Sequence, residues 1–338
     1  MSSHHLALIT SPLQLINLRQ LCVDRGLYKK DLMLVVKFSK KDASAQALKN
    51  ELKLDYGDWG DIIVFENKNK FLHLKRLLKR LCPLEWETVI SGELTSWWQN
   101  VVVANLRFEE RVIIDDGTMT LFDYHKFLQK GVDYQKIKPG KSFFLRVLSI
   151  RAKIKKPWPI TIFSLFPLAS NKYVKCEKNS LSVLKTTLDK PCEYLVNTPK
   201  KRLFLGQPFV DNKEISEKEY FDVVSHFSFQ SKSECWYLPH RSESKDTIDK
   251  LREIENLKVM TYTLPAEKVV GQHENSYSQI AGINSTALFT LHVLYPEIPI
   301  YYYSIKEFSS VSHALLQRSL VIEEFIKQQE NTYQLSGA

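Results

Sequence analysis

The sequence predicts an α/β protein with two domains, each built on a parallel sheet wrapped by helices. Three observations indicate this class. Short apolar runs of strand length alternate with segments of helical length and spacing. The alternation becomes unclear near the middle of the chain and restarts near residue 195. The length of 338 residues exceeds one typical domain and allows two, each with its own core.

The first half of the chain contains a regular series of predicted elements. Residues 6–10 predict a strand, and Ser11 and Pro12 then open a helix with apolar positions near helical spacing. Further strands are expected at 32–36, 62–65, 88–91 and 111–114, and helices at 43–54, 71–80 and 93–106. The stretch 123–179 shows few clean periodicities and is expected to be an insertion or a lid.

The second half repeats the alternation. A strand at 202–205 runs into Gly206 and Gln207, and Ser216 caps a helix that extends to residue 227. Strands are also expected at 234–238, 258–262, 280–283 and 300–303, and helices at 247–254, 287–294 and 312–329. We expect domains at 1–195 and 196–311, and a terminal helix within 312–338 that packs toward the N-terminal domain.

The composition is typical of a globular protein in a reducing compartment. Hydrophobic residues make up 44% of the chain, and no stretch approaches the roughly 18 apolar residues that a membrane span needs. The first residues lack the basic start and cleavage site of a secretory signal. Five cysteines are scattered without metal-ligand spacing, which argues against a disulfide framework or a metal site. We expect a cytoplasmic protein without a metal.

The net charge of +9 raises the question of an anionic partner. No nucleic-acid-binding motif accompanies the basic residues, so nucleic acid is not expected. The positive charge gathers at 68–80 and 136–156, where it is interleaved with aromatic and aliphatic residues. This mixture suits a peripheral contact with an anionic membrane surface, or an anionic acceptor. A solvated basic face fits the same residues.

The clearest functional signal is IIDDGT at 113–118. The apolar run breaks directly into Asp115 and Asp116, as expected where a buried strand delivers side chains into a cleft. A strand that ends in an Asp-Gly turn fits the same letters. A phosphatase of the haloacid dehalogenase type is excluded, because Ile114 occupies the position of its nucleophilic aspartate. A partly desolvated carboxylate beside a like charge fits a general base.

The second half offers three further candidates. His240 follows a strand that ends in Pro239, and an imidazole there can bind or protonate a leaving phosphate, although a structural histidine fits too. Ser285 and Thr286 precede an apolar helix, where they act as a cap or as part of a phosphate cradle. Glu267 lies in a predicted loop, where it either accepts hydrogen bonds from a ribose or is simply solvated.

Five short motifs are spread along nearly the whole chain. They are SPLQLI at 11–16, IIDDGT at 113–118, FLGQPF at 204–209, YLPH at 237–240 and INSTALF at 283–289. Together they resemble bacterial sialyltransferases of the two-domain glycosyltransferase B fold. The likeness is to the lipooligosaccharide sialyltransferases, similar to glycosyltransferase family 52, and to their polysialyltransferase relatives.

The resemblance implies two Rossmann-like domains that face a central cleft. It also implies an inverting, metal-independent transfer of sialic acid from CMP-sialic acid. By resemblance, Asp116 is the general base with Asp115 beside it, and His240 is the histidine at the leaving phosphate. In the family this histidine is normally followed by proline, whereas here Arg241 follows it and Pro239 precedes it.

The resemblance also implies substrate contacts. It assigns the leaving phosphate to Ser285 and Thr286, and the ribose to Glu267. Six further substrate contacts are expected at Gly206, Gln207, Pro239, Pro12, Gln14 and Gly92. The expected partners are a CMP-sugar donor and a cell-surface glycan acceptor, lipid-linked or free, with no cofactor. The implied location is the cytoplasm, at the inner face of the cytoplasmic membrane.

Two other functions fit the same motifs. The first is a transferase for another CMP-activated acidic sugar such as Kdo, because the motifs specify the nucleotide and phosphate better than the sugar. The second is a non-catalytic protein that binds glycans or takes part in their assembly.

Overall fold

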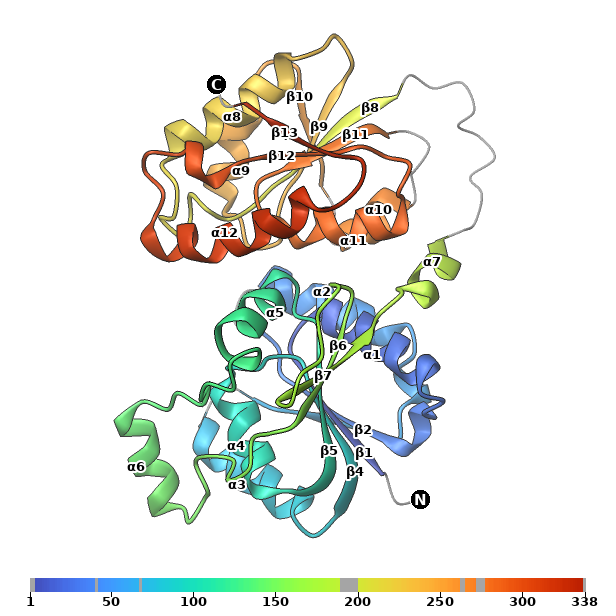
Figure 1. Ribbon diagram of the computed structural model, residues 1–338, viewed down its shortest axis with the longest axis vertical. Helices are drawn as coiled ribbons and strands as arrows, with labels where there is room; N and C mark the ends of the chain where they lie inside the picture. The colour runs from blue at the N-terminus through green and yellow to red at the C-terminus, as the bar shows by residue number, and fades with distance from the viewer. Residues whose placement is uncertain are drawn as a thin grey trace. The chain divides into compact units, whose positions relative to one another are not determined.

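The computed structural model describes residues 4–39, 42–66, 69–188, 200–261, 265–271 and 277–336. The chain forms two compact units, Met1–Val183 and Leu184–Ala338. The predicted boundary between residues 195 and 196 lies outside the described residues. Each unit is built around one sheet with helices packed against it (Figure 1).

The N-terminal unit contains a seven-stranded parallel sheet. Its strands are β1 (His5–Ile9), β2 (Leu32–Val36), β3 (Asp61–Val64), β4 (Glu85–Ser91), β5 (Arg107–Ile114), β6 (Ile160–Ser164) and β7 (Val174–Lys178). They lie side by side in the order β3-β2-β1-β4-β5-β6-β7. β1 and β2 are buried throughout and, apart from His5, apolar, because helices cover both faces of a parallel sheet.

The helices of this unit are α1 (Pro12–Asp24), α2 (Asp42–Lys53), α3 (Lys70–Leu81), α4 (Trp97–Asn105), α5 (Thr118–Asp123) and α6 (Pro139–Val147), with α7 (Ser182–Leu188) at the junction of the two units. Successive side chains of β1 point to opposite faces of the sheet. Leu6 and Leu8 belong to the core formed with α3 and α4, whereas Ala7 and Ile9 belong to the core formed with α1 and α2. The sheet is therefore the middle layer of three.

The expectation that residues 123–179 form an insertion or a lid is wrong. The second part of this stretch forms β6 and β7, which extend the sheet beyond β5. Its first part forms α6 and a π-helical turn at Tyr124–Leu128 that continues α5. Because β7 lies at the sheet edge and is only partly buried, its sequence VKCEK lacks the apolar run of a central strand.

The C-terminal unit contains a six-stranded parallel sheet. Its strands are β8 (Lys201–Leu205), β9 (Cys235–Leu238), β10 (Leu257–Val259), β11 (Tyr277–Gly282), β12 (Ile300–Tyr303) and β13 (Thr332–Leu335). Their order is β10-β9-β8-β11-β12-β13. The helices of this unit are α8 (Glu217–Phe229), α9 (Lys245–Leu251), α10 (Ala266–Gly271), α11 (Thr286–Leu294) and α12 (His313–Lys327).

Two expectations about the end of the chain are corrected. The final helix ends at Lys327, and the chain then forms β13, so the strand at 300–303 is not the last one. β13 pairs with β12 in parallel, as the outermost strand of the sheet. The predicted packing of the terminal segment toward the N-terminal domain stays a prediction.

Both sheets place their first strand beside their fourth, β1 beside β4 and β8 beside β11. The strand order reverses at these pairs, and open parallel sheets bind ligands at the carboxyl ends of the strands there. In the N-terminal unit these ends carry Gln14, Gly92 and Asp116, after β1, β4 and β5. In the C-terminal unit they carry Gln207, His240 and Ser285, after β8, β9 and β11.

Candidate active site

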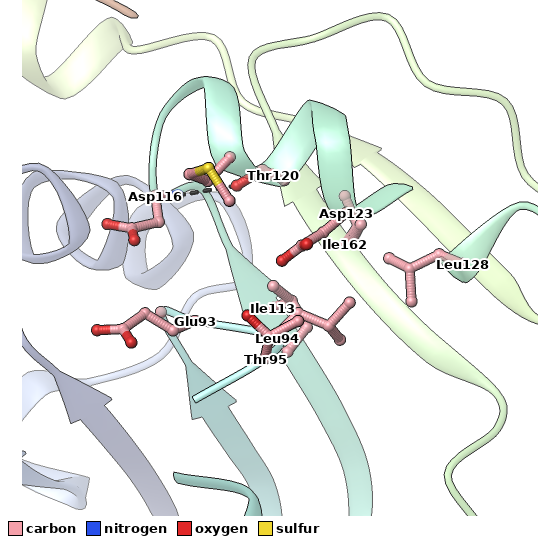
Figure 2. A pocket seen from close by; sticks show the side chains of 11 residues that line it. Glu93, Leu94, Thr95, Ile113, Asp116, Thr120, Asp123, Leu128 and Ile162 are labelled. Carbon is pink, nitrogen blue, oxygen red and sulfur yellow. Dashed lines mark hydrogen bonds between the residues drawn. The ribbon is translucent and has the colours of Figure 1, made fainter. Parts of the chain in front are cut away.

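Asp116 follows the end of β5 and lines a pocket of about 160 Å³ in the N-terminal unit (Figure 2). Gln14 Nε2 donates a hydrogen bond to Asp116 Oδ1 at 2.8 Å, and Ser11 Oγ lies 3.4 Å from the same oxygen. The backbone N–H of Asp116 donates to Thr120 Oγ1 at 2.9 Å. The half-buried carboxylate is therefore oriented by two side chains at the start of α1.

Gln14 is fully buried and links the ends of two strands. Its Oε1 accepts a hydrogen bond from the backbone N–H of Thr10 at 2.7 Å, while its Nε2 donates to Asp116. A Cβ atom at Gly92 would lie 2.1 Å from Gln14 Cδ, so a side chain at this position would displace the amide. The structure thus brings together three predicted site residues. Pro12, a fourth, is buried in the first turn of α1.

Asp115 has a different position from its neighbour. Its carboxylate is fully buried and accepts hydrogen bonds from Ser164 Oγ at 2.8 Å and from the Leu165 backbone N–H at 2.6 Å. Burial raises the pKa of Asp115 to about 7. The prediction grouped Asp115 with the catalytic residues. The structure gives it contacts that tie the end of β5 to the end of β6, and its place among the catalytic residues stays a prediction.

Asp123 is a pocket residue that the sequence did not predict. It lies in the last turn of α5, is 6% exposed, and its carboxylate points toward the pocket (Figure 2). Burial raises the pKa of Asp123 to about 7, and the nearby Asp116 charge adds to the shift. One feature of the sequence could have identified Asp123, because it is an acidic residue within the apolar segment LFDY. The segment around it lacks clear periodicity, so the sequence predicts no helix there.

His240 lies two residues beyond the end of β9. Its Nδ1 accepts a hydrogen bond from the backbone N–H of Ser242 at 3.1 Å. Because Nδ1 is the acceptor, the neutral ring carries its proton on Nε2, which leaves Nε2–H as the donor. The ring is therefore oriented by the turn that follows the strand.

A buried chain of hydroxyl groups connects the His240 turn to the loop after β8. The backbone N–H of His240 and the hydroxyl of Tyr237 both donate to the Glu243 carboxyl. Tyr237 Oη lies 2.8 Å from Tyr220 Oη, which in turn accepts from the backbone N–H of Gln207 at 2.9 Å. Burial raises the pKa of Glu243 to about 8. The sequence did not predict this network.

The predicted residues Gly206 and Gln207 lie against this network and against α11. A Cβ atom at Gly206 would lie 2.5 Å from both the Glu243 carboxyl and the Tyr237 hydroxyl, so a side chain would displace them. Gln207 Nε2 donates to Ser285 Oγ at 3.0 Å. Pro239, also predicted, is half-buried directly before His240.

Ser285 caps α11, as the sequence predicts. Its Oγ accepts from the Ala287 backbone N–H at 3.3 Å, and Thr286 is the first helical residue. The start of the helix thus carries two hydroxyl groups, those of Ser285 and Thr286, and the phosphate contact assigned to them stays a prediction.

Glu267 lies in α10 rather than in the predicted loop. It is buried, and its carboxylate accepts a hydrogen bond from the Thr290 hydroxyl of α11. It therefore lies against the helix that follows Ser285. Its role at a ribose stays a prediction.

Three findings concern the part of the chain that the structure describes. Within it, no group of three or more His, Cys, Asp or Glu side chains is arranged to hold a metal ion. None of its helices combines the length and the apolar character required to cross a membrane. Its four cysteines, Cys22, Cys82, Cys176 and Cys235, are free thiols, while Cys192 lies outside the described residues.

Solved structures share this fold at low sequence identity. An α/β-galactoside α2,3-sialyltransferase from Photobacterium phosphoreum matches with a TM-score of 0.51 and 13% identity, over 99% of this chain and 98% of that one. A 2,6-sialyltransferase from Photobacterium sp. JT-ISH-224, in complex with CMP and lactose, gives 0.52 and 15%, over 98% and 78%.

The GT-B domain of the sialyltransferase from Photobacterium damselae gives a TM-score of 0.52 and 12% identity, over 98% of this chain and 100% of that one. These likenesses confirm the predicted glycosyltransferase B fold. Among curated proteins, no sequence matches this chain.

The family comparison covers most of the chain and includes all five motifs. The model of the alpha-2,8-polysialyltransferase (POLYST) family matches residues 5–304. The predicted sialyltransferase resemblance, which included the polysialyltransferases, is confirmed. The chain belongs to the alpha-2,8-polysialyltransferase family and is a glycosyltransferase of the sialyltransferase type.

Proposed function

We propose that the protein transfers sialic acid from CMP-sialic acid to a hydroxyl group of a cell-surface glycan, with inversion at the anomeric carbon. Candidate acceptors are lipooligosaccharide, O-antigen and capsule. The observation that carries this proposal is the Asp116 carboxylate, oriented by Gln14 and Ser11 at a pocket in a member of a sialyltransferase family. A solved structure of the same fold holds CMP and lactose, the two kinds of ligand that the proposal requires.

In the acceptor half of the reaction, Asp116 acts as the general base. It removes the proton from an acceptor hydroxyl as that oxygen attacks the anomeric carbon of the donor. The new carbon–oxygen bond forms while the bond to the CMP phosphate breaks, and the electron pair leaves with CMP. Gln14 donates to Oδ1 and so holds the carboxylate in place for this proton transfer.

In the donor half, the phosphate gains negative charge as its bond to the sugar breaks. Nε2–H of His240 and the start of α11, with Ser285 and Thr286, are the groups proposed to stabilise this charge. These hydrogen-bond donors act more strongly on the departing phosphate than on the phosphate of the intact CMP-sugar. This difference accelerates the chemical step. CMP is a monophosphate leaving group, so we propose that neither a metal ion nor a cofactor is required.

A panel of CMP-activated sugars tests this function. We expect CMP release and glycan labelling with CMP-sialic acid and a glycan acceptor, and much less of either with CMP-Kdo. A preference for CMP-Kdo would overturn the choice of sugar. If calorimetry detected no binding of CMP, the result would instead support the non-catalytic alternative. The panel and the calorimetry together separate the three functions that the motifs allow.

We also propose a peripheral contact with an anionic membrane surface through α6. Its Phe143, Phe144 and Val147 side chains are 63%, 53% and 65% exposed. Leu145 on the opposite side of the helix is fully buried in the core that includes α3 and α4. The helix therefore buries Leu145, stacks Phe144 on Phe71 of α3 with ring centroids 5.3 Å apart, and leaves about half or more of each of the three side chains exposed.

Positive charge surrounds this exposed apolar surface. Lys141 Nζ lies 4.5 Å from the centre of the Trp97 ring, and Lys70 Nζ lies 5.8 Å from it. Partial burial lowers the pKa of Lys141, and the like charges of Lys70 and Lys138 lower it further. Exposed aromatic residues beside crowded cations are the combination that binds the interface of an anionic bilayer.

Replacing Phe143 and Phe144 by serine is expected to weaken binding to anionic vesicles by about 10-fold or more, because each phenyl ring contributes roughly 1.5–3 kcal/mol when buried. Co-sedimentation with phosphatidylglycerol vesicles measures the effect. Phe229→Ser is the matched control, because that phenylalanine is 55% exposed in the other unit. Equal binding by the double variant and the control would contradict the proposed contact.

A further inference from the structure

We propose that Glu243 is a positioning residue for the departing phosphate, because its carboxyl group holds in place the groups that are assigned to that phosphate. This inference rests on the proposed function, in which His240, Ser285 and Thr286 contact the phosphate of CMP. These residues follow two different strands, β9 and β11. They can act on one phosphate only if the loops after the two strands keep a fixed arrangement.

The first observation is the contact between the Glu243 carboxyl and the turn after β9. Its Oε2 accepts a hydrogen bond from the backbone N–H of His240. The Glu243 backbone N–H donates to the His240 carbonyl oxygen at 2.9 Å, and the Ser242 backbone N–H donates to His240 Nδ1 at 3.1 Å. The carboxyl group therefore helps to fix the backbone from which the imidazole extends.

The second observation is a chain of hydrogen bonds that begins at the other carboxyl oxygen, Oε1. This oxygen is bonded to the Tyr237 hydroxyl, and Tyr237 Oη lies 2.8 Å from Tyr220 Oη. Tyr220 Oη accepts from the backbone N–H of Gln207 at 2.9 Å, and Gln207 Nε2 donates to Ser285 Oγ at 3.0 Å. Glu243 is thus connected, through side chains of β9 and α8, to the hydroxyl group that caps α11.

The third observation is that this network is enclosed. Glu243 is 9% exposed, and the Tyr237 and Tyr220 side chains are fully buried. A Cβ atom at Gly206 would lie 2.5 Å from the Glu243 carboxyl and from the Tyr237 hydroxyl, so the glycine leaves room for the network beside the end of β8. A hydrogen bond shielded from water is stronger than an exposed one, and the loss of one partner leaves a buried group unsatisfied. The loops after β8, β9 and β11 are therefore linked to one another.

Two substitutions at Glu243 are expected to have different effects. Glu243→Leu removes the contacts to both His240 and Tyr237. Glu243→Gln keeps one oxygen that can accept from the His240 N–H, and its amide group can donate to the Tyr237 hydroxyl. Because burial raises the pKa of Glu243 to about 8, the carboxyl group is mainly uncharged at pH 7, and an uncharged amide is a close match for it. The glutamine variant should therefore preserve the network.

The affinities of CMP and cytidine measure the phosphate contacts separately from the nucleoside contacts. The two ligands differ by one phosphate group, and calorimetry gives both dissociation constants. Glu243→Leu should reduce the preference for CMP over cytidine by about 10-fold or more, because one hydrogen bond to a charged group contributes a factor of this size. Its affinity for cytidine should change little. Its kcat for sugar transfer should fall by at least the same factor, because the phosphate contacts strengthen as the bond breaks.

Glu323→Leu is the matched control for Glu243→Leu. Glu323 is also a buried glutamate, and its carboxyl accepts from the Ser304 hydroxyl and the Ile305 backbone N–H at the turn after β12. No phosphate contact is proposed at that turn. This variant should therefore lose stability in thermal unfolding without a change in the preference for CMP, whereas Glu243→Gln should retain most of that preference.

Tyr220→Phe tests the second branch of the network with less risk to the fold. It keeps the ring and removes the hydroxyl that links the Gln207 backbone to Tyr237. The preference for CMP should fall by about 3- to 10-fold, the contribution of one hydrogen bond. Its effect and that of Glu243→Leu should be less than additive in the double variant, because both act through one network. Tyr303→Phe is the control, because Tyr303 is buried in the same unit and its hydroxyl contacts His226 Nδ1 at 3.1 Å.

The outcomes separate this inference from the proposed function. If the wild type bound CMP no more tightly than cytidine, the proposed phosphate contacts would be wrong, and this inference would fail with them. If the wild type preferred CMP and both Glu243→Leu and Tyr220→Phe kept that preference, Glu243 would not position the phosphate contacts, and the proposed function would stand. If Glu243→Leu did not fold, the preference of Tyr220→Phe relative to Tyr303→Phe would decide.

Discussion

Asp116→Asn is expected to reduce sugar transfer by about 10²–10⁴-fold while the protein still folds and binds CMP. Asparagine has nearly the same shape as aspartate, and its carbonyl oxygen can still accept the hydrogen bond from Gln14 that now reaches Oδ1 at 2.8 Å. It cannot take a proton from the acceptor hydroxyl. The loss should therefore appear in kcat, measured as CMP release in the presence of acceptor.

The fold and donor binding must be measured in the same Asp116→Asn sample. CMP binding by calorimetry should be unchanged, because the proposed phosphate contacts, His240 and Ser285, belong to the other unit. Asp58→Asn makes the same change at an exposed aspartate of the same unit, which pairs with Lys29. This control variant should transfer at the wild-type rate. If Asp116→Asn transferred at near the wild-type rate, Asp116 would not be the general base.

Much of the fold could be predicted because its central strands are buried on both faces. The predicted strands at 32–36 and 300–303 agree with β2 and β12 to the residue. In both cases a short apolar run is bounded by polar residues or proline, which defines its ends. Because these strands are parallel, their carboxyl ends lie at one edge of each sheet, and this explains why Asp116 and Gln14, both assigned through the family resemblance, lie in hydrogen-bond contact.

The missed strands have physical reasons in their own sequences. β7 and β13 are edge strands, and each is paired on one side only. In VKCEK and TYQL, polar and charged residues face solvent, so no apolar run remains to mark a strand. β6 is apolar and buried but lies next to β7 in a stretch of short helices, where the alternation is hard to follow.

The missed site residues depend on tertiary packing. Asp123 and Glu243 are acids that the sequence alone would place at the surface. Their burial results from the packing of α5 over the pocket and of the Tyr237 and Tyr220 hydroxyls against the turn after β9. No local pattern encodes these contacts, because the partners lie in separate elements of the chain.

His240→Ala is expected to lower kcat by about 10²–10³-fold, the usual cost of removing one donor to a developing negative charge. Two conservative variants separate the chemical role of the imidazole from its structural role. Its Nδ1 accepts from the Ser242 backbone N–H at 3.1 Å, and its Nε2–H is the proposed donor to the phosphate. Nδ1 therefore supports the turn, whereas Nε2–H is the atom proposed to act on the phosphate.

The amide group of an asparagine side chain lies near the position of Nδ1, and that of a glutamine side chain lies near the position of Nε2. If His240 acts on the phosphate, His240→Gln should recover part of the transfer rate through its amide N–H, whereas His240→Asn should remain close to His240→Ala. If the histidine only supports the turn that ends at Glu243, the order of the two variants should reverse, because asparagine preserves the acceptor for Ser242. CMP release under saturating donor and acceptor measures the rates, and thermal unfolding shows whether the turn is intact. Because the two roles predict opposite rankings, the comparison decides between them even if every variant is slower than the wild type.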